Sequence, residues 1–393
     1  MKVALVHELL TMKGGAEHVL RVFAEMFPDA PIYTLLYDEK KLGDWFPSKR
    51  VHPSKLNSQF SILNSQFRFN HHLYLSKFPE AIEAWDFSEF DLVISSSSAF
   101  AHNIITNGKP KHLSFIHSPA RYLWDRTHDV FEQAGKGIFG PLKRMYLKRI
   151  FHTLRLWDAE SSARADRIIV ASKEVQRRVE LYWRRESTVV YPPIDDFWLH
   201  TRDSPLTTHH SPSTIHDSRS YFLVVSTLVP YKRIELAIEA CIRAGKHLKI
   251  VGEGPNRTRL EKLAAKLQHP TPYAQLPLIE FYGYRRGDEL KDLYAGAQAT
   301  IVPGDEDFNL VALESMACGT PVIAFASGGP LETIPEGKTG EFFREPNAES
   351  LQEALEKYDQ KKYSFDACVQ QAQQFSKNQF LQNMEREIAT VMK

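Results

Sequence analysis

The sequence predicts an α/β protein built from two parallel-sheet domains. Short apolar runs typical of buried strands alternate with segments of helical apolar spacing along the whole chain. At 393 residues the chain is longer than one hydrophobic core usually supports. Between Pro192 and Arg219 the composition turns to Pro, Ser, Thr, His and Asp, as in a linker. We therefore expect domains over 1–195 and 220–375, and a C-terminal helix over 376–393 that crosses back to the first domain.

The first domain begins with a predicted strand over Lys2–Val6. Gly14 and Gly15 then precede a predicted helix, whose apolar residues recur on one face from Val19 to Phe27. Further strands are predicted at Asp91–Ser95, Leu113–Ile116, Arg167–Ala171 and Thr188–Tyr191. Strands that alternate with helices favour a parallel sheet.

The second domain repeats this alternation. Strands are predicted at Tyr221–Ser226, His247–Val251, Ile279–Tyr282, Ala299–Val302 and Pro321–Ala324. A helix is predicted from Leu310 to Cys318, ending at Gly319. The last helix, from Asn378 to Lys393, carries an apolar stripe that must pack against another part of the protein: Phe380, Met384, Ile388 and Val391.

Charge and cysteine content limit the class of protein. The net charge is +1, with 27 Lys and Arg against 21 Asp and Glu in residues 1–193, leaving 22 against 27 in the rest. Three cysteines form neither a disulfide framework nor a metal-ligand cluster. The first seven residues do not resemble a signal peptide, and no uncharged apolar run approaches membrane-spanning length. We expect a cytoplasmic protein whose membrane association, if any, is peripheral on the inner face.

Two segments of the first domain are candidates for a surface contact. Residues 55–69 hold the repeat Leu-Asn-Ser-Gln-Phe with an offset of seven residues, and this segment either packs on its own domain or covers an acceptor groove or membrane. Residues 141–157 interleave basic and apolar side chains, which is typical of a helix on an anionic membrane and equally of a solvated helix face. No recognised nucleic-acid module accompanies these charges, so no nucleic-acid partner is expected.

The most informative segment is the acidic run from Gly304 to Ala324. Glu306 lies in the predicted loop between a strand and a helix, and Glu314 lies inside that helix. Free backbone N–H groups at a helix start suit a phosphate. The carboxylates would then accept hydrogen bonds from sugar hydroxyls. An acidic capping loop with a surface glutamate explains the spacing equally well.

The residues then carry a family resemblance. Glu306–Glu314 resembles the E-x7-E signature of the retaining GT-B glycosyltransferases of family 4, and further blocks resemble that family in order along the chain. These blocks are His117–Asp125, Val225–Arg233, Ile250–Pro255 and Phe325–Gly329. The variants Val-Pro-Tyr-Lys-Arg and His-x-Pro-x-Arg-Tyr-Leu-Trp-Asp are similar to the mannosyltransferase-like branch that uses GDP-mannose for surface polysaccharide and lipid-linked glycans.

This resemblance implies a GT-B fold, with two Rossmann-like parallel-sheet domains that face a central cleft. The implied reaction moves a hexose, best mannose from GDP-mannose, to a glycan or polyprenyl-linked acceptor with retention of configuration. Glu306, Lys232 and His117 would be the catalytic residues. The donor would be bound by Gly14, Gly15, Arg233, Gly283, Tyr284, Phe308, Asn309, Leu310 and Glu314. Acceptor-side candidates are Arg121, Trp124 and Asp125.

The implied chemistry needs neither a cofactor nor a metal ion. The nucleotide-sugar is a co-substrate, and no Asp-x-Asp metal motif stands at the expected place. Glu314 would accept hydrogen bonds from the ribose hydroxyls, while Glu306 would accept them from the transferred sugar. Lys232 and then Arg233 would stabilise the negative charge that grows on the departing diphosphate.

The sequence also departs from the family pattern. Thr227 stands where relatives have an Arg, Arg233 and Asn309 stand where many have Gly, and Ala171 replaces a common Asn. Lys232 does not reproduce the bidentate geometry of the missing Arg. A degenerate protein that only binds sugar nucleotides is therefore an alternative, as is the same transferase with a UDP-sugar. An NAD-dependent oxidoreductase is disfavoured because no full G-x-G-x-x-G follows the first strand.

Overall fold

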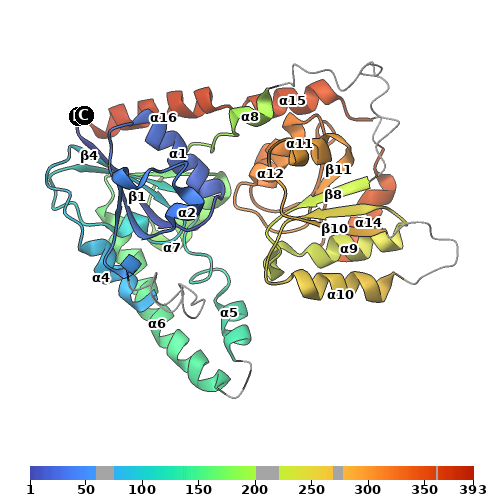
Figure 1. The fold of residues 1–393 in the computed structure, drawn as a ribbon, viewed down its shortest axis with the longest axis horizontal. Helices are drawn as coiled ribbons and strands as arrows, with labels where there is room; N and C mark the ends of the chain where they lie inside the picture. The colour runs from blue at the N-terminus through green and yellow to red at the C-terminus, as the bar shows by residue number, and fades with distance from the viewer. Residues whose placement is uncertain (59–74, 136, 138, 201–220, 269–277, 360–361) are drawn as a thin grey trace. The chain divides into compact units, whose positions relative to one another are not determined.

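The computed structural model of the chain describes residues 1–58, 75–135, 137, 139–200, 221–268, 278–359 and 362–393. The chain divides into two compact units (Figure 1). The first comprises Met1–Pro192 and Phe380–Lys393, and the second comprises Pro193–Gln379. Most of the repeat predicted over 55–69 and most of the predicted linker lie outside the described residues.

The first unit is built on a seven-stranded sheet in which all paired strands are parallel. Its strand order is β3-β2-β1-β4-β5-β6-β7. The strands are β1 (Val3–Leu10), β2 (Ile32–Tyr37), β3 (Val51–Pro53), β4 (Leu92–Ser97), β5 (Lys111–Ile116), β6 (Arg167–Val170) and β7 (Thr188–Val189). The order reverses at β1, which pairs with β2 on one side and β4 on the other.

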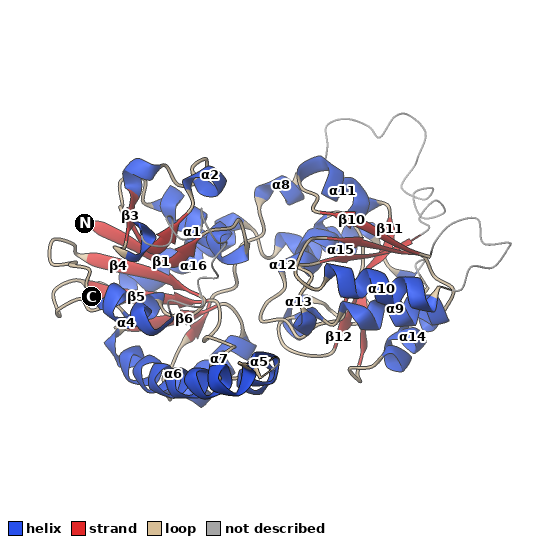
Figure 2. Cartoon of the chain, turned by 60° about the horizontal axis from the view of Figure 1, so that its bottom comes forward, coloured by secondary structure: helices blue, strands red, loops and turns tan. Residues whose placement is uncertain are grey.

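Helices cover both faces of this sheet (Figure 2). Alternate residues of β1 serve the two faces: Val3 and Leu5 pack in one apolar core, while Ala4 and Val6 pack in the other. The helices are α1 (Gly15–Met26), α2 (Glu39–Leu42), α4 (Phe78–Glu83), α5 (Thr127–Ala134), α6 (Gly140–Ser161), α7 (Lys173–Trp183) and α16 (Lys377–Val391). Short 3₁₀ turns lie at Ser48–Arg50, Ala101–Asn103 and Ser162–Arg164.

The C-terminal helix α16 completes the core of the first unit. Its apolar stripe, predicted from helical spacing, is buried: Phe380, Met384, Ile388 and Val391. The Phe380 ring lies 5.5 Å from that of Phe23 on α1 and 5.7 Å from that of Phe115 on β5. Aromatic contacts of this kind stabilise a core beyond the area they bury.

The second unit holds a six-stranded parallel sheet in the order β10-β9-β8-β11-β12-β13. Its strands are β8 (Tyr221–Val225), β9 (Leu248–Val251), β10 (Ile279–Gly283), β11 (Ala297–Val302), β12 (Val322–Phe325) and β13 (Gly340–Phe343). Its helices are α8 (Asp196–Leu199), α9 (Ile234–Arg243), α10 (Arg257–Leu267), α11 (Gly287–Ala295), α12 (Leu310–Ala317), α13 (Pro330–Thr333), α14 (Ala348–Lys357) and α15 (Phe365–Gln373). A 3₁₀ turn lies at Pro230–Lys232.

Both sheets have the same topology. Counted within its own unit, each runs in the Rossmann order 3-2-1-4-5-6, and the first adds one further strand. In such sheets ligands bind beyond the carboxyl ends of the strands, where the order reverses. These reversal points, β1/β4 in the first unit and β8/β11 in the second, are therefore where functional side chains are expected.

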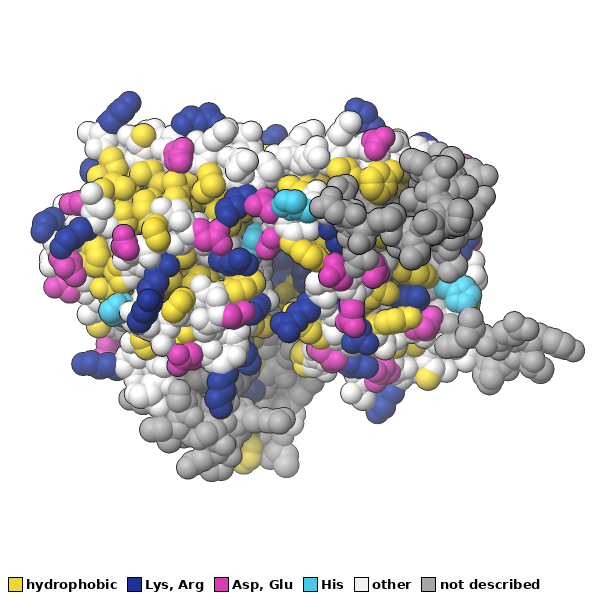
Figure 3. All heavy atoms as spheres, turned by 45° about the horizontal axis from the view of Figure 1, so that its top comes forward, with side chains coloured by type: hydrophobic (Ala, Val, Ile, Leu, Met, Phe, Trp, Pro, Cys, Tyr) yellow, Lys and Arg dark blue, Asp and Glu magenta, His cyan; other side chains and the backbone are white. Residues whose placement is uncertain are grey.

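The surface reflects the nearly equal numbers of acidic and basic residues in the chain. Acidic and basic side chains are interspersed over the face shown in Figure 3. Among the helices of the described residues, none is both long enough and apolar enough to cross a membrane.

Candidate functional site

The reversal point of the second unit holds an ion pair between two predicted catalytic residues. Lys232 follows β8 in a 3₁₀ turn, and Glu306 follows β11. The Lys232 Nζ lies 2.7 Å from Oε1 and 2.5 Å from Oε2 of Glu306. The two side chains are 21% and 16% exposed. Burial lowers the pKa of Lys232, but the Glu306 carboxylate and neighbouring groups raise it above its ordinary value, so the cation is retained.

The loop that carries Glu306 is fixed by the loop after β12. The Gly329 N–H donates to the carbonyl oxygen of Glu306 at 2.9 Å, and the Ser327 hydroxyl donates to Asp305 at 2.7 Å. Gly328 has φ +62°, and a Cβ there would lie 2.2 Å from the Glu306 carbonyl oxygen. Only glycine fits this position, so the Ser-Gly-Gly segment holds the loop that carries Glu306.

The second glutamate of the signature, Glu314, lies on α12. Its Oε2 accepts a hydrogen bond of 2.8 Å from the hydroxyl of Tyr294 on α11. Burial raises the pKa of Glu314 to about 7; the Tyr294 hydroxyl opposes this rise, and Asp195 adds to it. The ring of Trp198 on α8 meets that of Tyr294 edge-on at 5.6 Å. Glu314 is therefore a carboxyl group that changes charge near neutral pH.

The start of α12 accommodates an asparagine at the position where the family resemblance implies a glycine. Asn309 is the N-cap and has φ +78°, a conformation that asparagine tolerates better than most residues. Its Oδ1 accepts the N–H of Ala312 at 3.3 Å. Its Nδ2 is buried without a partner among the described residues. Phe308 is buried against Phe375, and Leu310 begins the helix. Asn309 therefore adopts the left-handed backbone conformation that a glycine would adopt, and its side chain adds a hydrogen bond to the N–H of Ala312.

Two departures from the family pattern lie on the loop after β8. Arg233 has φ +51°, the left-handed conformation that favours the glycine implied here by the family resemblance. Its guanidinium lies 5.5 Å from the Phe325 ring centre. Thr227 is exposed at the position where an Arg was expected. The loop therefore carries two cations, Lys232 and Arg233.

Gly283 is the last residue of β10, and Tyr284 follows it. In the sheet, β9 lies between β10 and β8. The Gly283 carbonyl oxygen accepts the Gly252 N–H at 2.8 Å, and Gly283 has φ +66°. Tyr284 is 60% exposed, so its ring is accessible to a ligand. Gly252 follows β9, so both glycines lie at the carboxyl edge of the sheet.

The predicted residues of the first unit lie at its own reversal point. Gly14 is the N-cap of α1 and Gly15 its first residue, directly after β1. His117 follows β5, and its Nε2 lies 2.8 Å from Oγ of Ser96 on β4. Burial, followed by the charge of His7, lowers the pKa of His117 to about 3. His117 is therefore neutral at physiological pH.

The three acceptor-side candidates form contacts within the first unit. Arg121 Nε lies 3.5 Å from Asp125 Oδ2, and Asp125 also lies 3.4 Å from Arg178 Nε. The Trp124 indole N–H donates to the buried Asp158 at 2.9 Å, and its ring stacks on Tyr182 at 4.8 Å. Trp124 therefore stabilises the packing of α6 and α7. The side chains of Arg121 and Asp125 are 16% and 18% exposed.

The structure brings the predicted residues together in separate groups. Glu306, Lys232 and Arg233 lie on the two loops that meet at β8/β11, and His117 lies beside β1/β4. The sequence did not identify four polar residues that contact these groups: His7, Glu17, Ser96 and Tyr294. Two of them could have been found from their place in the sequence. His7 directly follows the predicted strand Lys2–Val6, and Ser96 directly follows the predicted strand Asp91–Ser95.

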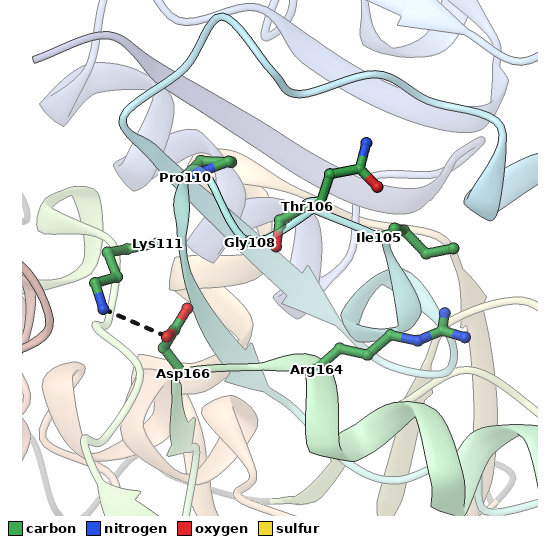
Figure 4. Close-up of a pocket in the computed structure, with 8 residues that line it drawn as sticks. Ile105, Thr106, Gly108, Pro110, Lys111, Arg164 and Asp166 are labelled. Carbon is green, nitrogen blue, oxygen red and sulfur yellow. Dashed lines mark ion pairs between the residues drawn. The ribbon is translucent and has the colours of Figure 1, made fainter.

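A hollow of about 370 Å³ lies at the opposite edge of the first sheet (Figure 4). Lys111 is the first residue of β5 and Asp166 precedes β6. Their side chains form an ion pair of 3.6 Å on the wall of this hollow. None of the predicted site residues lines it. Within the described residues, no group of three His, Cys, Asp or Glu side chains is arranged to hold a metal ion.

Comparison with known proteins identifies the class first through the fold. The structure of Anabaena Alr3699/HepE in complex with UDP has a TM-score of 0.69, with 18% identity, and the alignment covers 99% of this chain and 100% of that chain. The likeness, together with the two sheets, confirms the predicted class: two Rossmann-like parallel-sheet domains of the GT-B fold.

The sequence comparisons concern mainly the second unit. Residues 207–379 match the family model of the Glycosyl transferases group 1. An uncharacterized glycosyltransferase of Methanocaldococcus jannaschii is 25% identical over 196 residues, which are 50% of each chain. The GDP-mannose-dependent alpha-mannosyltransferase of Mycolicibacterium smegmatis is 29% identical over 192 residues, 47% of this chain and 46% of that protein. The alignments span about half the length of these curated relatives. Over this part of the chain, the protein is therefore similar to the Glycosyl transferases group 1.

Proposed function

We propose that the protein is a retaining glycosyltransferase that transfers a hexose from a nucleoside diphosphate sugar. The observation that carries this proposal is the Lys232–Glu306 ion pair at the reversal point of the second sheet, one turn before the helix that holds Glu314. The match of residues 207–379 to the Glycosyl transferases group 1 supports it. At this edge of the sheet, the cation of Lys232 would bind the diphosphate. The carboxylates of Glu306 and Glu314 would accept hydrogen bonds from the sugar and the ribose.

In the proposed complex each charged group changes partner. The diphosphate accepts hydrogen bonds from Lys232 and Arg233, and the sugar hydroxyls donate to Glu306. The ribose hydroxyls donate to Glu314 in its ionised form. Before the donor binds, the charges of Lys232 and Glu306 compensate each other in the ion pair. In the complex, the diphosphate replaces Glu306 as the partner of Lys232, and the sugar hydroxyls replace Lys232 as the partners of Glu306. Phe308, Asn309 and Leu310 are assigned to the sugar and distal phosphate.

The proposed transfer occurs on one face of the sugar. The bond between the anomeric carbon and the phosphate oxygen breaks, and the acceptor oxygen forms its bond to that carbon on the same face. The acceptor proton passes to the departing phosphate oxygen, so no side-chain nucleophile and no metal ion take part. Lys232 and Arg233 stabilise the charge that develops on the leaving group. In the first unit, His117 and the Gly14-Gly15 loop are assigned to the sugar and distal phosphate, and Arg121 and Asp125 to the acceptor.

For the donor we propose GDP-mannose, with a UDP-sugar as the alternative. The mannosyltransferase-like motifs and the mannosyltransferase relative support the first. The likeness to a structure that holds UDP supports the second. The proposed acceptor is a glycan or polyprenyl-linked glycan of a surface polysaccharide, at the cytoplasmic face of the membrane.

Transfer from labelled sugar nucleotides tests the proposed activity. The purified protein is incubated with radiolabelled GDP-mannose, UDP-glucose or UDP-N-acetylglucosamine and with membranes as the source of acceptor. One donor should label the membrane fraction without added metal, and EDTA should not reduce this labelling. Glu306→Gln should abolish it. Sugar-nucleotide binding with neither transfer nor hydrolysis would instead support the degenerate binding protein, for which the exposed Thr227 is the supporting observation.

A second proposal concerns contact of α6 with an anionic membrane. The outward face of α6 and its N-cap expose large apolar side chains, at 55 to 79%: Phe139, Leu142, Met145, Tyr146 and Leu156. Four exposed basic residues lie among them, Lys143, Arg144, Lys148 and Arg149, and no acidic residue occurs between Phe139 and Trp157. Apolar side chains flanked by cations suit the boundary of anionic lipids.

Vesicle co-sedimentation tests this contact. The protein should bind vesicles that contain phosphatidylglycerol and not vesicles of phosphatidylcholine alone, and salt should weaken the binding. The double variant Met145→Ser, Tyr146→Ser should lose it. Leu331→Ser, at an exposed leucine of the second unit, is the matched control and should bind normally. Equal binding by both variants would mean that the face of α6 is simply solvated.

A further inference from the structure

A buried chain of polar side chains lies behind His117 in the first unit. Glu17 on α1 lies 3.6 Å, Oε1 to Nε2, from His7 on β1. The His7 Nδ1 lies 2.8 Å from the carbonyl oxygen of Ser96 on β4, and the Ser96 Oγ lies 2.8 Å from the His117 Nε2. His7, Glu17 and Ser96 are all buried, whereas His117 is partly exposed. The chain therefore ends at one accessible imidazole.

The geometry determines the protonation of His7. Its Nδ1 must donate, because the carbonyl oxygen of Ser96 can only accept. If Nε2 carried no hydrogen, its lone pair would face the carboxylate of Glu17. A second hydrogen on Nε2 replaces that repulsion with an ion pair. Glu8 on the same strand adds a further carboxylate, and His117 is the third titratable group nearby. Burial lowers the pKa of His7, but Glu17 and Glu8 raise it above its ordinary value.

Ser96 then determines the tautomer of His117. The Ser96 Oγ lies 3.3 Å from the His7 Nδ1, which is a donor, so Oγ accepts there. The single hydroxyl hydrogen remains for the His117 Nε2, the other hydrogen-bond partner of Oγ in the described part of the chain. An Nε2–H on His117 would leave this buried hydroxyl hydrogen without an acceptor, which is costly. A neutral His117 with bare Nε2 carries its hydrogen on Nδ1.

We propose that Glu17, His7 and Ser96 are positioning residues that hold His117 in the neutral tautomer with hydrogen on Nδ1. The exposed side of the ring then offers a donor to an oxygen of the ligand. Gly14 lies beside this chain, since a Cβ at Gly14 would lie 2.7 Å from Oε2 of Glu17. The tautomer itself follows from the contacts alone. That the ligand oxygen belongs to the transferred sugar rests on the proposed function.

Nitrogen-15 NMR of the full chain tests this inference directly. Correlation spectra of the imidazole nitrogens distinguish the two neutral tautomers and the charged ring. At neutral pH His117 should show a protonated Nδ1 and a bare Nε2, and His7 should show two protonated nitrogens. The signals are assigned by their loss in His7→Gln and His117→Gln. A His117 protonated at Nε2, or a neutral His7, in the wild-type protein would overturn the proposal.

A matched pair of variants tests the role of Glu17. Glu17→Gln should make His7 neutral near pH 7 and remove the ion pair that fixes its ring. The released ring can then turn its bare nitrogen toward the Ser96 hydroxyl, which leaves Oγ free to accept from His117, so His117 should populate both tautomers. Glu25→Gln, on the same helix and paired with Arg21 at the surface, should leave both rings unchanged. Ser96→Ala should mix the His117 tautomers while His7 stays charged. Unchanged His117 signals in both Glu17→Gln and Ser96→Ala would show that these residues do not set the tautomer.

Kinetics then separate this inference from the proposed function. With an active donor, Glu17→Gln should lower kcat/KM about 10- to 100-fold, the range seen when a metal-ligating histidine loses its hydrogen-bond partner, and should alter its pH profile. Glu25→Gln should change neither. If the wild-type protein transfers no sugar but shows the expected tautomer, the proposed function alone fails. If it is active and the tautomer is the other one, only the present inference fails.

Discussion

Removing the Lys232–Glu306 ion pair in steps should separate its effect on stability from its effect on transfer. Lys232→Met leaves the Glu306 carboxylate, only 16% exposed, without its cation. Loss of one partner from a buried pair costs about 3–5 kcal/mol, and from an exposed pair less than about 1 kcal/mol. For this mostly buried pair we expect the free energy of unfolding to fall by about 2 kcal/mol.

Adding Glu306→Gln removes the unpaired charge. The double variant should therefore recover most of that loss, to within about 1 kcal/mol of the wild type, since replacing both charges of a buried pair is nearly neutral. Transfer should not recover, because the leaving diphosphate still lacks its cation and the sugar lacks its acceptor. We expect at least about a 100-fold loss in every variant of the set.

Urea denaturation, monitored separately from labelled-sugar transfer, measures the two effects. The reasoning is refuted if the double variant is no more stable than Lys232→Met, because the pair would then not be electrostatically coupled. It is equally refuted if either single variant keeps near-full transfer activity while folding normally.

Three further predictions concern charges elsewhere in the two units. Thr227→Arg should restore the missing cation and tighten nucleotide binding about 10-fold, as a charged hydrogen bond of about 1.5 kcal/mol would, measured by calorimetry; weaker binding would mean that Arg233 already fills this place. For Glu314, whose pKa burial raises to about 7, the folded form binds the proton more tightly than the unfolded form, so stability should fall as pH rises from 4.5 through 7. Glu314→Gln should remove up to about 3 kcal/mol of that fall in denaturation at several pH values, and should also remove the increase in nucleotide affinity with pH. An unchanged fall would refute the assignment. His112 behaves in the opposite way: burial lowers its pKa to about 3, so its contribution to stability is present above pH 6.5 and is lost as pH falls toward 3. His112→Asn should flatten the acid side of the thermal-denaturation profile, and a profile as steep as the wild type's would contradict this.

Apolar patterns predicted most of the strands that are buried on both faces of the two sheets. The predicted strands at Leu113–Ile116 and Arg167–Ala171 correspond to β5 and β6, and the predicted helix at Leu310 agrees with α12. The strand β13 was not predicted because it is four residues long and lies at the sheet edge, where pairing with β12 stabilises it more than its own pattern does. The strand β2 was also missed, although its six residues are rich in aromatic and β-branched side chains.

The candidate site shows what patterns cannot supply. Glu306 and Lys232 are 74 residues apart, and they meet because β8 and β11 are neighbours in the sheet. Only the family resemblance linked them in advance. His7 and Ser96 are 89 residues apart and meet because β1 pairs with β4. No local spacing encodes these contacts, so the positioning chain behind His117 emerges only from the folded structure.

The most direct test of the central claim is release of nucleoside diphosphate from a panel of sugar nucleotides, with membranes as acceptor and without metal. The claim predicts that one sugar nucleotide yields its diphosphate together with labelled glycan, and that Glu306→Gln yields neither while it still folds. It is contradicted if the wild-type protein binds the donors but releases no diphosphate, or if Glu306→Gln releases it as fast as the wild type.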